Sequence, residues 1–177
     1  PPRSTLFPYT TLFRSQIREL ERLEIPYEVV PGVTAAFAGA AMLRRELTLP
    51  GVSQTIILTR HAGKTPMPEG ESLPELARHR ATLAIYLSVD KLREIVAELI
   101  PHYGADCPVA VLHRVSWPDQ DGVVGTLADI AAKVEVKGFT RTALILVGRV
   151  IQPEGFPPSY LYSAEHAEWY RRNSEAD

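Results

Sequence analysis

The sequence predicts an α/β fold in which helices cover both faces of one sheet. Short β-branched runs alternate with helical patterns along the chain. These runs are almost continuously apolar, as expected for strands that are buried on both faces. The length of 177 residues is sufficient to bury such a core.

Composition and charge narrow the class of protein. A hydrophobic content of 45%, a charged content of 23% and a net charge of −2 are ordinary for a soluble domain. They offer no basic surface for nucleic acid or for a membrane. Cys107 is the only cysteine, which excludes an internal disulfide and suits a reducing compartment. We therefore expect a cytoplasmic protein that binds neither nucleic acid nor membrane.

The first fifteen residues differ from the rest of the chain. They read PPRSTLFPYTTLFRS and contain the tripeptide TLF twice. The segment has the pattern of neither a signal peptide nor an amphipathic helix. One choice of codons for residues 5–15 resembles an adapter oligonucleotide used in sequencing libraries. We expect residues 1–15 to be non-native, and we assign them no function.

Residues 16–47 are expected to form a helix, a short strand and a second helix. Apolar residues at helical spacing predict the first helix over 16–23, and residues 27–30 are β-prone. Pro31-Gly32 then turns the chain, and Thr34 is placed to cap a helix made largely of alanine and glycine. Such small side chains allow a helix to lie close against a sheet or a ligand.

The later elements follow from hydrophobic pattern and turn residues. Apolar, β-branched runs predict strands at 54–59, 82–89, 108–113, 122–126 and 142–150. Helical periodicity predicts helices at 73–80, 91–100 and 127–134. Ser72 and Glu75 form the capping-box pattern before the first of these helices. Residues 60–72 are expected to be a polar loop.

Familiar catalytic motifs are missing from the chain. It has no HExxH, CxxC, GxSxG, Walker A or complete GxGxxG sequence. The five histidines are too far apart to suggest a local metal site, so we expect no metal and assign no catalytic residue. Ligands of open α/β sheets collect at the carboxyl ends of strands. The corresponding segments here are 31–34, 59–61, 87–89 and 114–116, although each alone fits a plain polar loop better than a ligand site.

Several longer motifs together resemble the tetrapyrrole (corrin/porphyrin) methyltransferase family. They are IPYEVVPGVTA (25–35), RELTLPGVSQTIILTR (45–60), MPEGESL (67–73), TLAIYLSV (82–89), RVSWPDQ (114–120), GTLADI (125–130) and TALILVGRVI (142–151). PGVTA, GTLADI and the last run resemble the family as a whole. ELTLPGVSQT, MPEGES and SWPDQ are similar to the members that methylate precorrin-4, or its cobalt form, at C(11).

The resemblance implies the C-terminal α/β domain of a tetrapyrrole methylase, preceded by a remnant (last strand and helix) of the N-terminal α/β domain. Family members carry a GxGPGD-like loop and a GDP loop before the matching region, and this sequence has neither. We therefore expect a fragment. Its expected parts are a non-native segment (1–15), a remnant with a connecting helix (16–47), a C-terminal methyltransferase domain (48–151) and a tail (152–177).

The activity that the resemblance implies is methyl transfer from S-adenosylmethionine to a ring carbon of a tetrapyrrole in cobalamin biosynthesis, by a homodimer. Carried over by position, the methyl-donor contacts would be Thr34, Ala35, Leu87, Val115, Ala143 and Leu144. Cations expected to bind the substrate carboxylates are Arg60, Lys64 and Arg114. Two alternatives stay open. The chain could methylate another ring carbon, or it could be an inactive fragment that only binds or dimerises.

Overall fold

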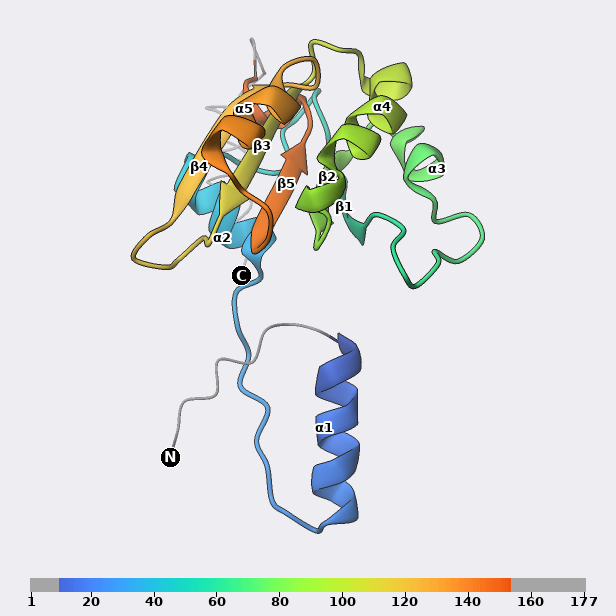
Figure 1. The fold of residues 1–177 in the computed structure, drawn as a ribbon, viewed down its shortest axis with the longest axis vertical. Helices are drawn as coiled ribbons and strands as arrows, with labels where there is room; N and C mark the ends of the chain where they lie inside the picture. The colour runs from blue at the N-terminus through green and yellow to red at the C-terminus, as the bar shows by residue number, and fades with distance from the viewer. Residues whose placement is uncertain (1–9, 154–177) are drawn as a thin grey trace, which may run out of the picture. The chain divides into compact units, whose positions relative to one another are not determined.

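The computed structural model describes residues 10–153, which divide into two compact units (Figure 1). The first unit, Pro1–Thr34, contains α1 (Thr10–Arg22). The second unit, Ala35–Asp177, contains all the other described helices and strands. The domain boundary expected at residue 47 stays a prediction.

The first unit differs from the sequence prediction in two respects. Helix α1 begins at Thr10, inside the segment that we interpreted as non-native. Residues 27–30 are exposed and form no strand, so that part of the prediction was wrong. A strand needs a neighbour for its backbone N–H and C=O groups. The described residues of this unit contain no other strand, and the Tyr27 hydroxyl contacts α1 instead, where it donates to Glu21 Oε1 at 3.1 Å.

The second unit is built on a five-stranded mixed sheet with the strand order β1-β2-β5-β3-β4 (Figure 1). The strands are β1 (Ile56–Arg60), β2 (Thr82–Tyr86), β3 (Pro108–His113), β4 (Asp121–Thr126) and β5 (Ala143–Val147). Strands β1 and β2 are parallel, whereas β5 is antiparallel to both of its neighbours and β4 is antiparallel to β3. The predicted α/β class is confirmed.

Three helices cover one face of this sheet. They are α3 (Leu73–Ala77), α4 (Leu92–Tyr103), which follows the short helix η1 (Val89–Lys91), and α5 (Ile130–Lys137). Leu83 and Ile85 of β2 point to this face, while Ala84 between them points to the other, as the two-residue period of a strand requires. We call the cluster on the helix-rich face the first core and the cluster on the opposite face the second core.

Helix α2 (Ala35–Leu43) and the short helix η2 (Arg149–Ile151) contribute to the second core. Gly39 allows α2 to approach the sheet closely. A Cβ atom at this position would lie 2.8 Å from Leu112 Cδ1 and 3.2 Å from Leu144 Cδ2. The sheet is therefore covered on both faces, and the close packing that the small residues predicted is confirmed.

Element boundaries follow local hydrogen bonds. Strand β3 has the predicted bounds, and the capping box forms, because the Ser72 backbone N–H donates to Glu75 Oε2 at 3.2 Å. The helix predicted at 127–134 instead begins at Ile130. Asp129 Oδ1 accepts a hydrogen bond of 2.8 Å from the Thr126 backbone N–H, which keeps residues 126–129 in a turn.

Substituting Gly39 tests the close packing of α2. We expect Gly39→Val to lower the free energy of unfolding by about 1–3 kcal/mol, because the added methyl groups collide with Leu112 and Leu144. Ala41→Val is the matched control: it places the same side chain on the exposed face of the same helix, where only helix propensity changes, by about 0.5 kcal/mol. Urea denaturation measures both. Equal losses would show that α2 does not depend on contact at Gly39.

Candidate functional site

The pairing of the strands brings several predicted site residues to one end of the sheet. In the register, Arg60 lies opposite Tyr86, and His113 lies opposite Ala143. Strands β1, β2 and β3 therefore end where β5 begins, because β5 runs in the opposite direction. We call this place the carboxyl end of the sheet. Leu87, Arg114, Val115 and Leu144 directly continue or adjoin these positions.

Backbone conformation marks the carboxyl end as unusual. The described chain has seven non-glycine residues with positive φ, and four of them lie there: Leu87 (57°), Arg114 (50°), Ser116 (71°) and Thr142 (53°). The left-handed region costs a residue with a Cβ atom roughly 1–2 kcal/mol. Sparsely populated backbone conformations of this kind cluster at ligand sites.

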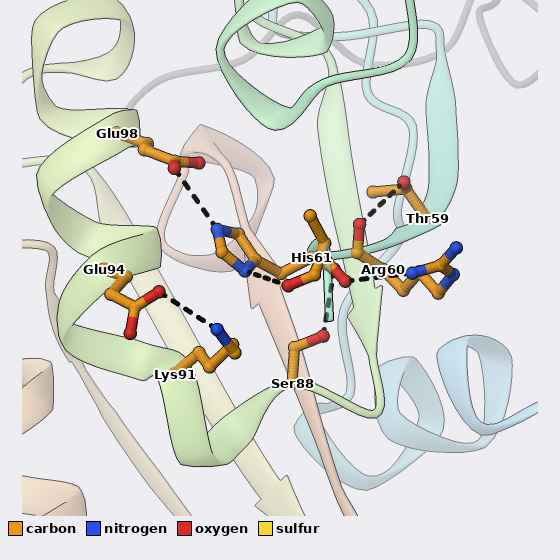
Figure 2. Close-up of polar contacts among 8 residues, drawn as sticks. Thr59, Arg60, His61, Ser88, Lys91, Glu94 and Glu98 are labelled. Atoms are coloured by element: carbon orange, nitrogen blue, oxygen red, sulfur yellow. Dashed lines mark hydrogen bonds and ion pairs between the residues drawn. The ribbon is translucent and has the colours of Figure 1, made fainter. Parts of the chain in front are cut away.

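Leu87 is the most exposed of the predicted donor-contacting side chains in the second unit. It is a large apolar residue with 57% of its surface exposed, and its neighbours Tyr86 and Ser88 are partly or fully buried. The buried Ser88 hydroxyl donates to the Tyr86 carbonyl at 2.7 Å. It accepts from the His61 backbone N–H at 2.9 Å (Figure 2). These bonds hold the left-handed residue between two fixed neighbours. We call residues 86–88 the Leu87 turn.

The other residues predicted to contact the methyl donor differ in which of their atoms are accessible. Ala143 and Val115 are half-buried, so parts of both side chains remain accessible. Leu144 is only 3% exposed and packs toward Gly39, so only its backbone could face a ligand. Ala35 is the first residue of α2, where the next backbone N–H, that of Ala36, donates to the Tyr86 hydroxyl at 3.0 Å. Thr34 is the last residue of the first unit and directly precedes α2.

Two of the three predicted cations already have partners in the protein. The Arg60 guanidinium donates to the carbonyl groups of His61, Thr65 and Pro66 at 3.3, 3.0 and 3.1 Å. Arg114 forms an ion pair of 2.5 Å with Asp119, and its guanidinium carbon lies 4.3 Å from the centre of the Trp117 ring. Both arginines therefore shape the loops that they begin.

Lys64 is different from these two arginines. It is exposed in the loop after β1 and forms no ion pair with any residue between 10 and 153. Its ammonium group is consequently available to an acidic ligand.

Titratable groups at the carboxyl end include His61, which contacts Glu98, and Asp121. Asp121, opposite His113 in the register, has its pKa lowered by a hydrogen bond from Lys137 and stays a carboxylate. The cysteine is elsewhere: Cys107 precedes β3, is fully buried, and burial raises the pKa of its thiol to about 11. No group of His, Cys, Asp and Glu within residues 10–153 could hold a metal ion.

Two further features lie outside the site. A cavity of about 270 Å³ is lined by Ser53, Arg80, Thr82, His102 and Gly148, at the opposite end of the sheet. Across the described part of the chain, every helix is too short or too polar to span a membrane.

The sequence places His61 in the candidate segment 59–61 but gives it no role, and it does not single out Glu98. The His61 side chain is only 8% exposed, and its Nε2 atom lies 3.2 Å from Glu98 Oε1 (Figure 2). Its position directly after a predicted strand was the one available signal. The partner lies on a different helix, so no spacing in the sequence connects them.

Replacing Leu87 by glycine tests the left-handed conformation. We expect Leu87→Gly to raise the free energy of unfolding by about 0.5 kcal/mol, because relief of the left-handed cost exceeds the entropy that glycine loses. Leu58→Gly is the matched control, since Leu58 is 52% exposed but has no positive φ; we expect it to destabilise the fold by about 1 kcal/mol. Chemical denaturation compares the two. A similar loss in both variants would contradict strain at Leu87.

Comparison with known proteins gives a consistent result. The family model of the Tetrapyrrole (Corrin/Porphyrin) Methylases matches residues 7–131. The chain is 67% identical over 156 residues to a precorrin-4 C(11)-methyltransferase of Pseudomonas aeruginosa, covering 88% of this chain and 62% of the relative.

Solved structures agree with the sequence match. A cobalt precorrin-4 methyltransferase, a cobalamin biosynthetic enzyme, superimposes with a TM-score of 0.76 and 38% identity, over 82% of this chain and 61% of the other. A uroporphyrin-III C-methyl transferase from Thermus thermophilus, solved in complex with S-adenosyl homocysteine, has a TM-score of 0.61 and 25% identity over 84% and 63% of the two chains. The chain thus spans about three fifths of the length of these proteins.

Proposed function

Because the chain belongs to the tetrapyrrole (corrin/porphyrin) methylases, we propose that it is part of a methyltransferase of cobalamin biosynthesis. The proposed reaction transfers a methyl group from S-adenosylmethionine to C(11) of precorrin-4 or of its cobalt form. The observation that carries this proposal is the 67% identity to a precorrin-4 C(11)-methyltransferase.

We propose further that the chain is the C-terminal part of this enzyme. The family motifs in the sequence lie between residues 25 and 151, and the described strands of the second unit form one sheet. In this proposal residues 48–151 are the C-terminal methyltransferase domain, residues 16–47 are the end of the preceding domain with a connecting helix, and residues 1–15 are non-native.

The carboxyl end of the sheet is the proposed binding site of the methyl donor. Leu87 presents an exposed apolar surface, and the half-buried Ala143 and Val115 provide smaller apolar surfaces nearby in the fold. An adenine ring prefers such surroundings, with backbone groups available to its polar edge. Leu144 would contribute its backbone. Thr34 and Ala35 are assigned from their place in the PGVTA motif.

The proposed methyl transfer depends on the placement of the two reactants more than on a catalytic side chain. S-adenosylmethionine, when bound, supplies an electrophilic methyl group on a sulfonium. The protein must hold the donor in line with the ring carbon and exclude water. The apolar residues at the carboxyl end suit this task, and the reaction does not require an acid–base pair there.

Recognition of the substrate carboxylates is proposed to involve three basic residues in different ways. Lys64 is available for direct contact, since it has no ion-pair partner among the described residues. Arg60 and Arg114 hold the loops after β1 and β3 in shape, at the same end of the sheet. We also propose a cytoplasmic homodimer, as the resemblance to the family implies.

Calorimetry with S-adenosylhomocysteine tests the donor site. The experiment compares this 177-residue chain with an extended protein, in which residues 16–177 follow the N-terminal part of the Pseudomonas aeruginosa relative. We expect the extended protein to bind. Leu87→Gly should weaken its binding about tenfold through loss of apolar contact, and Leu58→Gly should leave the affinity unchanged.

The outcomes separate the alternatives. Binding by the extended protein alone supports a donor site shared with the preceding domain. Tight binding by the 177-residue chain would place the whole donor site in this part. Binding by neither would overturn the proposal. Production of cobalamin in a bacterium that lacks its own precorrin-4 C(11)-methyltransferase, restored by the extended protein, distinguishes C(11) from another ring carbon.

A further inference from the structure

Besides the chain itself, which runs from Ser88 through η1 into α4, the Leu87 turn is connected to α4 through His61. The His61 imidazole lies between two hydrogen-bond acceptors, the Ala62 carbonyl at 3.0 Å from Nδ1 and Glu98 Oε1 at 3.2 Å from Nε2 (Figure 2). An ionised carboxylate only accepts hydrogen bonds. In the tautomer whose proton is on Nε2, the ring donates a hydrogen bond to Glu98.

Glu98 is a fixed partner for this contact. It lies on α4 between Ile95 and Leu99, which are both 0% exposed in the first core. The helix cannot shift there without opening the core. Glu98 itself is 35% exposed at its side chain, so it reaches His61 from the rim of the core.

The backbone of the same histidine reaches the Leu87 turn. Its N–H group donates to the Ser88 hydroxyl at 2.9 Å, and that hydroxyl donates to the Tyr86 carbonyl at 2.7 Å. Strand β1 is one of the two edge strands of the described sheet, where it pairs only with β2. Beyond Arg60 the ladder ends, so the backbone of residue 61 stays in place only through contacts such as these.

We propose that His61 is a positioning residue for the methyl-donor site. By donating to Glu98, it holds its own backbone N–H against Ser88, and Ser88 in turn fixes the left-handed Leu87 turn at the carboxyl end of the sheet. The inference rests on the proposed function in one respect, namely that Leu87 contacts the donor. The connection of Glu98, His61 and Ser88 to the Leu87 turn stands on the contacts alone.

Variants of Glu98 test the connection without touching the Leu87 turn. Glu98→Ala removes the acceptor of His61, whereas Glu98→Gln keeps an acceptor oxygen at the same place. Glu94→Ala is the matched control, because Glu94 lies one turn earlier on α4 and, among the described residues, pairs only with Lys91, at 3.2 Å (Figure 2). It removes an exposed ion pair from the same helix.

The first measurement is residue-resolved amide hydrogen exchange on the 177-residue chain. We expect the His61 amide to exchange about five to ten times faster in Glu98→Ala, the factor that loss of one hydrogen bond gives. Glu98→Gln should restore protection to within about twofold of the original chain, and Glu94→Ala should not change it. Equal exchange in Glu98→Ala and Glu94→Ala would overturn the proposal.

The second measurement is the affinity for S-adenosylhomocysteine, determined with the extended protein. Glu98→Ala should weaken binding about five- to tenfold, while Glu98→Gln and Glu94→Ala keep the original affinity. Thermal denaturation midpoints are measured as a check. If Glu98 had a merely structural role, Glu98→Ala would lower the midpoint, but Glu98→Ala and Glu98→Gln would have the same affinity.

The outcomes separate the role of His61 toward the methyl donor from its role in fixing the Leu87 turn. A His61 amide that becomes labile with no loss of affinity would overturn the role toward the donor. If no form of the protein binds S-adenosylhomocysteine, the proposed donor site fails, and the role of His61 toward the donor fails with it. The exchange comparison then still decides whether Glu98 and His61 fix the Leu87 turn.

Discussion

The position of β5 is the constraint on which the second unit depends. This strand lies between β2 and β3, runs antiparallel to both, and is buried from Leu144 to Val147. Because β5 is antiparallel to each neighbour, β2 and β3 point the same way although they never touch as neighbours. Their ends, the end of β1 and the start of β5 consequently meet at the carboxyl end of the sheet. If β5 were parallel to them, Ala143 would lie at the opposite end, and the proposed donor residues would be separated by the full length of a strand.

This arrangement also explains how the carboxyl end can hold a strained backbone. Leu87, Arg114 and Thr142 each leave or enter one of the three central strands in a left-handed conformation. The largely buried central strands fix the chain on one side of each residue, and hydrogen bonds fix the other side. Ser88 donates to the Tyr86 carbonyl at one turn, and the Arg114 N–H donates to the Thr142 carbonyl, 2.9 Å away, at the next. The core therefore supplies the stability that the turns lose. Backbone strain that is retained in this way is expected where a chain must present side chains to a ligand.

The sequence predicted the elements of the second unit well, because apolar runs and helical periodicity report burial directly. It located β3 to the residue and anticipated the close approach of α2. It failed where the outcome depends on a partner distant in the chain. Residues 27–30 have the composition of a strand but no strand to pair with among the described residues of their unit. The antiparallel direction of β5 and the contact between His61 and Glu98 are likewise set by tertiary structure, and no local pattern encodes them.

The loop after β1 carries residues proposed to position the methyl-donor site and a residue proposed to bind the substrate. Its start is held twice, by the Arg60 guanidinium on three carbonyl groups and by His61 on Glu98 and Ser88. The same loop carries Lys64, which faces no carboxylate of the described chain. A lysine could not replace Arg60, because one ammonium group does not have the planar fork that reaches separate carbonyls. The residue that shapes the loop and the residue available to an acidic substrate are thus different, so the charge at Lys64 can serve binding because Arg60 provides the structure.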